Sequence, residues 1–242
     1  MFKAVTTSLL SLVYPLECRI CGGQVASSDT GSACKTCWTS TRIFTGTEMT
    51  CDKCGAFFGD EAAPVPVYCH KCDDHFYDKA VAVGVYEKGL AAAIVDLKTS
   101  PNLSKGAISA IETGLRRIDL TNVDLIIPIP LSKLRKIERG FNQADVIAAA
   151  VARTTRIPVD QLSLGRKVHT PIHRAGMDQK ARELSVKNAF EVLRPNLIAG
   201  KNVLLVDDVF TSGATSSYCA KVLKKAGSGR VDVFTLARAV LN

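Results

Sequence analysis

The sequence predicts an α/β protein, with a mostly parallel sheet flanked by helices, behind a small cysteine-rich module. From about residue 77 onward, strand-like and helix-like segments alternate, which is the pattern of a parallel sheet with helical crossovers. Eight of the nine cysteines fall in four Cys-x-x-Cys pairs between residues 18 and 72. Further on, four apolar residues (203–206) run directly into two aspartates and a loop of small and hydroxylated residues.

At the N-terminus, residues 1–16 are apolar with a single Lys3, and their apolar positions follow helical spacing. The run is too short to span a bilayer, and no small-residue cleavage site follows it before Cys18. We therefore expect a short amphipathic helix that packs on the protein, with a signal peptide as the alternative. No membrane span is expected elsewhere, and the cysteine usage favours a reducing compartment, the cytoplasm.

The cysteine pairs predict structural zinc. A Cys-x-x-Cys turn presents two thiolates to one ion, and two such turns complete a tetrahedral site, so four pairs imply about two zinc ions. We favour sequential pairing over a crossed RING-like pairing that fits the spacing nearly as well, while disulfides would need an oxidising compartment. Four thiolates already close a site, so His70 and His75 are expected to be bystanders. The predicted ligands are Cys18, Cys21, Cys34, Cys37, Cys51, Cys54, Cys69 and Cys72.

After this module the hydrophobic pattern predicts four strands and four helices. The strands are expected at 81–86, 123–127, 203–206 and 231–236, and the helices at 90–98, 104–116, 142–153 and 214–226. Cys219, alone in the last helix, is expected to be a core residue. The predicted domains are an N-terminal helix with a double zinc ribbon (1–76) and the α/β domain (77–242).

Two basic segments lie between these elements. Pro128-Ile-Pro130 ends a strand, and the residues after it, LSKLRKIERGFNQ, are expected to be a basic loop at the edge where α/β sheets bind ligands. Arg139 in this loop is a candidate anion-binding residue; the alternative is that it and its neighbours solvate a helix end. Residues 165–188 are polar, basic and aperiodic, as expected of a functional loop. Its candidate cations are Arg166, Lys167, Arg182 and Lys187, whereas His169 and His173 are expected at the surface.

The net charge of +8 is concentrated in the same part of the chain. Residues 131–190 carry twelve Lys/Arg against five Asp/Glu. This favours an anionic partner such as phosphate, pyrophosphate or nucleic acid, although a solvated helical surface explains it as well. Aromatic residues make up 6% of the chain, and no aromatic-rich stacking platform for nucleic acid stands out.

The segment VLLVDDVFTSGAT (203–215) suits a sugar phosphate. The carboxylates of Asp207 and Asp208 can accept hydrogen bonds from ribose hydroxyls. The loop amides and the dipole of the helix that follows favour a phosphate group.

This segment resembles the motif by which type I phosphoribosyltransferases bind phosphoribosyl pyrophosphate (PRPP). Together with IPIPLSKLRKIERGFNQ, the four cysteine pairs and the spacing of Arg182, Asn188 and Phe190, it resembles the ComF family over nearly the whole chain. The resemblance implies the type I phosphoribosyltransferase fold behind a double zinc ribbon.

The resemblance also implies residue roles. Asp207 and Asp208 would bind the ribose hydroxyls, and residues 166–188 would form a flexible loop over the reacting centre. The 5′-phosphate would lie on Thr211, Ser212, Gly213, Ala214 and Thr215, and the candidates for the pyrophosphate loop are Ile129, Pro130, Leu131 and Arg139. In a true transferase, Mg²⁺ would neutralise the departing pyrophosphate. Phe210, Ser212 and His173 depart from the family pattern, but none of them removes a phosphate-binding group.

Three functions follow as hypotheses. The first is a ComF-like protein with a PRPP-type site that handles incoming single-stranded DNA during natural transformation, beside a helicase-like protein from the ComF operon. The second is an active phosphoribosyltransferase that uses an amine or nucleobase acceptor, for which the sequence identifies no residues. The third is a PRPP-regulated binding module. Whether the chain catalyses a reaction is left open by the sequence.

Overall fold

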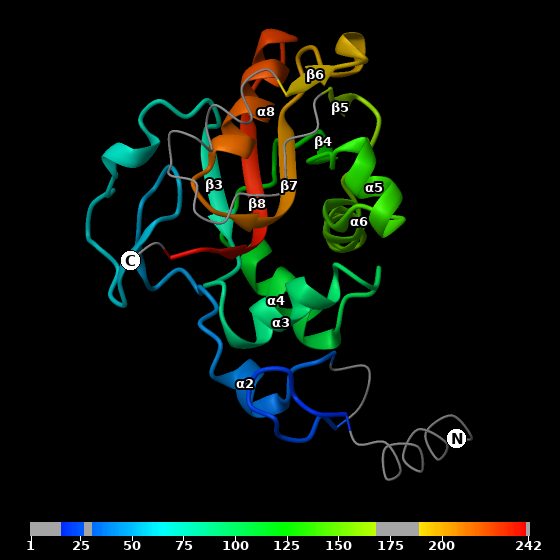
Figure 1. Cartoon of the computed structure of the whole chain (residues 1–242). Coiled ribbons are helices and arrows are strands. Elements are labelled where there is room, and N and C mark those ends of the chain that lie inside the picture. Colours follow the sequence, from blue (N-terminus) through cyan, green and yellow to red (C-terminus); the bar gives the residue numbers. More distant parts are fainter. Residues whose placement is uncertain (1–15, 27–30, 168–188, 241–242) are drawn as a thin grey trace.

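The computed structural model describes residues 16–26, 31–167 and 189–240. Its centre is a parallel sheet in the order β3, β8, β7, β4 (Figure 1). These strands are β3 (Lys79–Ala82), β8 (Val231–Arg238), β7 (Val203–Phe210) and β4 (Leu125–Pro128). Parallel neighbours need crossover connections, and helices supply all of them. The predicted fold class, a mostly parallel sheet flanked by helices behind a small cysteine-rich module, is confirmed.

The remaining elements surround this sheet. The helices of the α/β part are α3 (Lys88–Asp96), α4 (Lys105–Leu115), α5 (Lys133–Arg139), α6 (Gln143–Thr155) and α8 (Ala214–Lys225), with a 3₁₀ turn η3 (Pro195–Leu197). A separate antiparallel pair consists of β5 (Leu164–Arg166) and β6 (Phe190–Val192). The cysteine-rich part contains α2 (Lys35–Thr39), β1 (Met49–Thr50), β2 (Phe57–Gly59) and η2 (His70–Cys72). Below, residues 16–48 are called the first ribbon and residues 49–76 the second ribbon.

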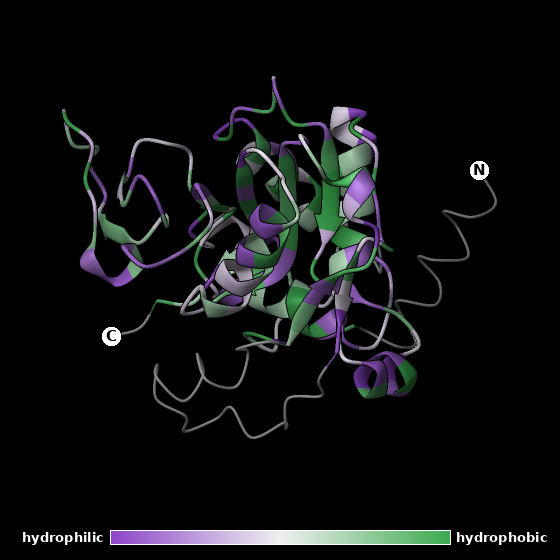
Figure 2. Cartoon of the chain, turned by 90° about the horizontal axis from the view of Figure 1, so that it is seen from above, coloured by the Kyte–Doolittle hydropathy of each residue, from purple (hydrophilic) through white to green (hydrophobic). Residues whose placement is uncertain are grey.

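The central strands of the sheet are apolar on both faces, so helices must cover both faces to keep them from water. Leu204 and Val206 of β7 pack into a core with α3, α4 and α6. Val203 and Leu205 belong to a second core with α8, where Cys219 is fully buried, as expected from the sequence. Viewed from above, hydrophobic residues gather on the strands at the centre of the molecule (Figure 2). The sheet therefore gives a rigid base for the loops at its carboxyl edge.

Local sequence signals explain where the helices begin. Ser104 caps α4 by accepting a hydrogen bond from the amide of Ala107, and Asn142 caps α6 by accepting one from Ala144. Ser132 caps α5 in the same way, and α5 ends at Gly140, whose φ of 77° is the left-handed conformation that favours glycine. The expectation of a loop over LSKLRKIERGFNQ is therefore wrong for residues 133–139, which form a helix.

Other sequence expectations need smaller corrections. The strand predicted at 203–206 continues to Phe210, because β8 extends alongside it and pairs with Asp207, Val209 and Phe210. Helix α8 begins at Ala214, so Thr215 is helical rather than part of the loop. The pair β5–β6 was not expected from a segment interpreted as an aperiodic loop. The expected N-terminal helix and the residues His169, His173, Arg182, Lys187 and Asn188 lie outside the described residues.

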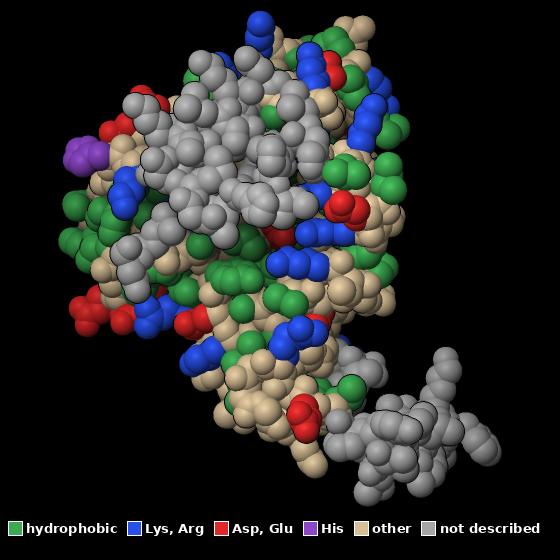
Figure 3. Space-filling view, in the orientation of Figure 1, with side chains coloured by type: hydrophobic (Ala, Val, Ile, Leu, Met, Phe, Trp, Pro, Cys, Tyr) green, Lys and Arg blue, Asp and Glu red, His purple; other side chains and the backbone are tan. Residues whose placement is uncertain are grey.

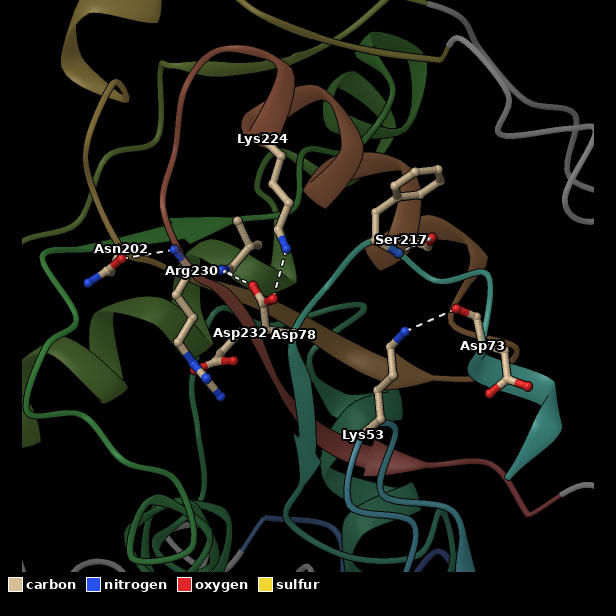
Figure 4. Close-up of polar contacts among 10 residues, drawn as sticks. Lys53, Asp73, Asp78, Asn202, Ser217, Lys224, Arg230 and Asp232 are labelled. Carbon is tan, nitrogen blue, oxygen red and sulfur yellow. Dashed lines mark hydrogen bonds and ion pairs between the residues drawn. The ribbon is translucent and has the colours of Figure 1, made fainter. Parts of the chain in front are cut away.

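The second ribbon is tied to the α/β part by the chain that leaves it (Figure 4). The amide of Phe76 donates to Ser217 Oγ of α8 at 3.1 Å. Asp78 accepts hydrogen bonds from Lys224 Nζ at 2.8 Å and from the amide of Val231 at 2.7 Å. These contacts fix the residues that follow Cys72 against α8 and β8. Within the described ranges, no helix is long and apolar enough to cross a membrane.

Candidate functional site

The structure gathers the eight paired cysteines into two groups of four. In each group the sulfur atoms lie within 4.8 Å of one another. The groups are Cys18, Cys21, Cys34 and Cys37, and Cys51, Cys54, Cys69 and Cys72. The cysteines are therefore grouped in sequential order and not crossed. His70 and His75 belong to neither group.

The geometry of both groups fits a tetrathiolate zinc site. Backbone amides point at the sulfur atoms: Cys34 N lies 3.3 Å from Cys18 Sγ, and Cys69 N lies 3.3 Å from Cys51 Sγ. The turns after Cys21 and Cys54 place Gly22 and Gly55 at φ of 71° and 69°. Four soft thiolates at this spacing suit Zn²⁺, so the two groups support about two structural zinc ions.

The thiol pKa values show why these groups need a cation. Burial raises the pKa of Cys18, but hydrogen bonds from neighbouring amides outweigh it and bring the pKa down to about 6. Burial and hydrogen bonds to the other sulfur atoms raise the pKa of Cys37 to about 12. Four crowded thiols cannot all ionise unaided, whereas a bound divalent cation stabilises all four thiolates.

The two ribbons differ in how they join the rest of the protein. Cys51, Cys54 and Cys72 of the second ribbon belong to the same buried core as Tyr77 and Phe210. Cys18, Cys34 and Cys37 of the first ribbon belong to a separate small cluster with Ala92 of α3. The second ribbon is therefore part of the main core, whereas the first is attached to a distant helix (Figure 1).

The acidic pair lies at the carboxyl edge of the sheet, inside β7. Asp208 N donates to Asp207 Oδ1 at 2.9 Å, and Val209 N donates to Asp208 Oδ1 at 2.7 Å. Both side chains are half-buried. Burial, together with the charge of Asp208, raises the pKa of Asp207 well above its usual range, and Arg166 opposes this shift. Because each carboxylate has a second oxygen, the pair can still accept hydrogen bonds from a ligand.

The segment proposed for pyrophosphate lies directly beside this pair. Pro128 of β4 pairs with Val206, and the amide of Ile129 donates to the carbonyl of Val206 at 2.8 Å. The carbonyl of Ile129 accepts from Asn142 Nδ2 at 3.1 Å, which fixes the segment against α6. Pro130 and Leu131 follow at the same edge and are half-buried. Arg139 lies at the other end of α5 and has no ion pair within the described residues.

The loop after β7 has a backbone shaped for close approach. Gly213 has a φ of 80° and is the N-cap of α8, with Ser212 Oγ 3.4 Å from the amide of Ala214. A Cβ atom at Gly213 would lie 2.6 Å from Phe210 Cζ and 2.8 Å from His75 Cε1. The first turn of an α-helix leaves amides unpaired, so this end of α8 suits an anion.

Two groups at this edge were not expected from the sequence. His75, interpreted only as a bystander to zinc, packs on Gly213 and hydrogen-bonds Tyr77 Oη through Nδ1 at 2.6 Å. Phe210, noted only as a departure from the family pattern, packs between Tyr77 and Arg238. The position of His75, three residues after Cys72, gives no sequence signal for such a contact. The contact depends on how the second ribbon packs against the loop before α8.

The basic residues near the site have separate roles. Arg166 lies over the ring of Phe190 at 5.2 Å and is an electrostatic neighbour of Asp207. Lys167 instead pairs with Glu191 at 3.1 Å. Arg166 is therefore the better placed of the two to meet an anion at the acidic pair.

Residues 9–73 match a family model described as "Double zinc ribbon domain". Competence protein F of Haemophilus influenzae is 37% identical over 131 residues, which are 54% of this chain and 57% of that protein. Competence protein ComFC of Bacillus subtilis is 34% identical over 116 residues, 48% of this chain and 45% of that protein. DNA utilization protein YhgH of Escherichia coli (strain K12) is 31% identical over 117 residues, 48% of this chain and 50% of that protein. The chain thus spans about half the length of these curated relatives.

Solved structures give weaker matches. A glutamine PRPP amidotransferase from B. subtilis, complexed with ADP and GMP, aligns with a TM-score of 0.36 and 22% identity over 53% of this chain and 26% of that chain. A hypothetical protein from Neisseria gonorrhoeae with bound ppGpp aligns with a TM-score of 0.34 and 20% identity over 55% of this chain and 65% of that chain. Scores this low do not bear on the residues of the site.

Proposed function

We propose that the chain is a ComF-family protein that has a PRPP-type site and handles incoming single-stranded DNA during natural transformation. Relatives named as competence and DNA utilization proteins support a role in competence. The observation that carries the PRPP-type site is the convergence of three segments at one sheet edge. These are the acidic pair, the segment after β4 and the loop before α8.

In this proposal each segment contacts a different part of PRPP. Asp207 and Asp208 accept hydrogen bonds from the ribose hydroxyls. Residues 211–215, which run from the loop into the first turn of α8, hold the 5′-phosphate with their backbone amides. Residues 129–131 and Arg139 face the pyrophosphate. Mg²⁺ bound with PRPP would supply charge neutralisation there, and the carboxylate of Asp208 offers the hard oxygen donor that it prefers.

Asp208→Asn tests the sugar site. The variant keeps the size of the side chain but loses the negative charge that strengthens hydrogen bonds from the ribose hydroxyls. We therefore expect the Kd for PRPP to rise by more than about tenfold. Isothermal titration calorimetry with Mg²⁺ and PRPP measures this directly. Asp119→Asn is the matched control, because the exposed Asp119 lies before the amino end of β4, at the opposite edge of the sheet from the proposed contacts. Equal PRPP affinity for the wild type and Asp208→Asn would rule out this role.

The DNA part of the proposal rests on charge. Helix α5 exposes Lys133 and Lys136, within the segment that carries most of the excess positive charge. Lys and Arg contacts to phosphates release counterions, so affinity should fall steeply with salt. We expect the variant Lys133→Glu/Lys136→Glu to weaken binding of oligo(dT) by about tenfold or more and to flatten its salt dependence. A wild-type affinity that is independent of salt would contradict the proposal.

An active phosphoribosyltransferase is the alternative that the same site supports. It would use an amine or nucleobase acceptor, and PRPP turnover with a panel of such acceptors, in the presence and absence of DNA, separates it from a binding role. We also propose that the protein acts in the cytoplasm beside a helicase-like partner. The domain boundary between residues 76 and 77 remains part of this proposal.

A further inference from the structure

The outer side of the second ribbon exposes large apolar side chains around one cavity. The cavity has a volume of about 420 Å³ and lies between the second ribbon, the loop after β7 and the end of β8. Phe58, Tyr68 and Val240 line it, and these residues are 46%, 65% and 48% exposed. Grouped apolar side chains that remain in contact with water are unusual on a folded surface and mark interaction sites. We call these three residues and the cavity the ribbon face.

The inner wall of the cavity is rigid. Phe210 is buried and lies under the guanidinium of Arg238, which is 4.6 Å from the centre of its ring. Arg238 Nη1 also donates to the carbonyl of Cys54 at 2.6 Å. This arginine is thus committed to holding the second ribbon on the sheet, and it is poorly placed to bind an anion that enters the cavity.

The surroundings of the ribbon face are acidic. Residues 49–76 contain five Asp/Glu, all exposed, against two lysines. Lys53 donates to the carbonyl of Asp73 at 3.2 Å, which leaves Lys71 as the exposed lysine of the second ribbon. The four thiolates of the ribbon also outweigh the two positive charges of a zinc ion. Hydrophobic and acidic side chains gather over this part of the molecule, whereas Lys and Arg lie mainly on the opposite side, over α5 and β5 (Figure 3).

This charge pattern decides between two classes of partner. A nucleic acid strand would find aromatic rings here but would bring its phosphates against exposed carboxylates, at a cost in affinity. A protein segment with an apolar side chain and flanking cations would bury the side chain in the cavity and pair its cations with the carboxylates. Protein interfaces commonly combine a buried apolar centre with charge complementarity at the rim.

We propose that the ribbon face docks a segment of a partner protein that inserts an aromatic or aliphatic side chain into the cavity and surrounds it with Lys and Arg. The binding energy would be concentrated on the inserted side chain and on Phe58 and Tyr68, as in other interfaces with a central anchor. The exposed acidic residues Glu61 and Asp74 would attract and orient the basic flanks, whereas Asp60 already pairs with Arg42 at 3.8 Å. This surface is separate from the basic side of the molecule on which the DNA proposal rests.

The test uses the full-length zinc-loaded protein and three fluorescein-labelled peptides. The first carries a Trp flanked by lysines, the second has Ser in place of the Trp, and the third has Glu in place of the lysines. Fluorescence anisotropy gives each Kd at low and high salt, and oligo(dT) is titrated in parallel. The protein variants are Phe58→Ser/Tyr68→Ser, Tyr68→Phe, and the control Leu162→Ser/Leu197→Ser, which removes two comparably exposed leucines elsewhere. Zinc content and Tm show that every variant is folded.

We expect the first peptide to bind wild-type protein at least about tenfold more tightly than either matched peptide, and more weakly as salt increases. The double ribbon variant should lose this preference, while Tyr68→Phe and the leucine control should keep it. Oligo(dT) should bind all variants equally. The proposal is overturned if the ribbon variant binds the peptides like wild type. It is also overturned if that variant loses affinity for oligo(dT) instead, because the ribbon face would then be a nucleic-acid surface.

Discussion

Gly213→Ala is expected to destabilise the protein by about 2–4 kcal/mol and to raise the Kd for PRPP about a hundredfold. Gly213 has a φ of 80°, a conformation that costs a residue with a Cβ atom about 1–2 kcal/mol. The added Cβ would also lie 2.6 Å from Phe210 Cζ and 2.8 Å from His75 Cε1. Neither ring can easily withdraw, because Phe210 is buried against Tyr77 and the ring of His75 is hydrogen-bonded to Tyr77 Oη. The loop backbone must therefore shift, and its amides would lose the geometry proposed to hold the 5′-phosphate.

Gly200→Ala is the matched control for this prediction. Gly200 has a similar φ of 74°, but a Cβ atom there would meet nothing within 4 Å. It should therefore incur the conformational cost alone and leave PRPP binding unchanged. Urea denaturation of the two variants, followed by calorimetry with PRPP, separates backbone strain from steric overlap. Equal losses of stability in both variants would show that the contact with His75 and Phe210 does not constrain the loop.

Local signals were sufficient to predict most of the fold from the sequence. Strands β4 and β8 and helices α3, α4, α6 and α8 lie close to their expected positions, because their apolar pattern marks them, and α4 and α6 also carry capping residues. Helix α5 was missed because its seven residues are mostly basic and bury no side chain, so no apolar face marks it. The sequence predicts that β7 ends at Val206, because charged residues usually end a buried strand. In the structure, pairing with β8 extends the strand through Asp207 and Asp208 to Phe210.

The candidate site was predictable only in part. Four-cysteine zinc sites have a local spacing rule, so their ligand groups could be listed from the sequence. The acidic pair and the loop were found because strand, carboxylates, glycine and helix follow one another directly. The contact of His75 with Gly213 joins residues 138 positions apart and has no sequence signal. The roles of Asp207, Asp208, residues 129–131 and the loop stay predictions until ligand binding is measured.

Loss of the second zinc ion should have a larger effect than loss of the first, because the second ribbon supports the proposed sugar-phosphate loop. Its backbone joins the sheet where Ala80 N donates to the carbonyl of Lys53 at 2.7 Å. From the same ribbon, His75 N donates to the carbonyl of Cys72 at 3.1 Å, and the ring of His75 packs on Gly213. Freeing the Cys69–Cys72 turn would therefore release the ring that fixes the loop.

The described residues of the first ribbon make no such connection to the loop. Two of its hydrogen bonds lie on the other side of the molecule, where Ser32 Oγ donates to Asp96 at 2.8 Å and Gly89 N donates to Thr41 Oγ1 at 3.0 Å. Residues Asp96 and Gly89 belong to α3, which covers the face of the sheet opposite α8. Unfolding of the first ribbon should thus uncover part of α3 and leave the carboxyl edge of β7 intact.

Two single substitutions compare the ribbons, since each removes one zinc ligand. We expect Cys69→Ser to lower the Tm by roughly 10 °C and to weaken PRPP binding at least about tenfold, because a cysteine-bound zinc ion contributes its binding energy to folding. Cys21→Ser should lower the zinc content to about one ion per chain as well but keep PRPP affinity within about twofold. Metal analysis, differential scanning calorimetry and PRPP titration on the same samples provide the three measurements. If both variants lose one zinc ion and bind PRPP equally well, the second zinc site stabilises its own ribbon without positioning the loop, and the contact between His75 and Gly213 is packing alone.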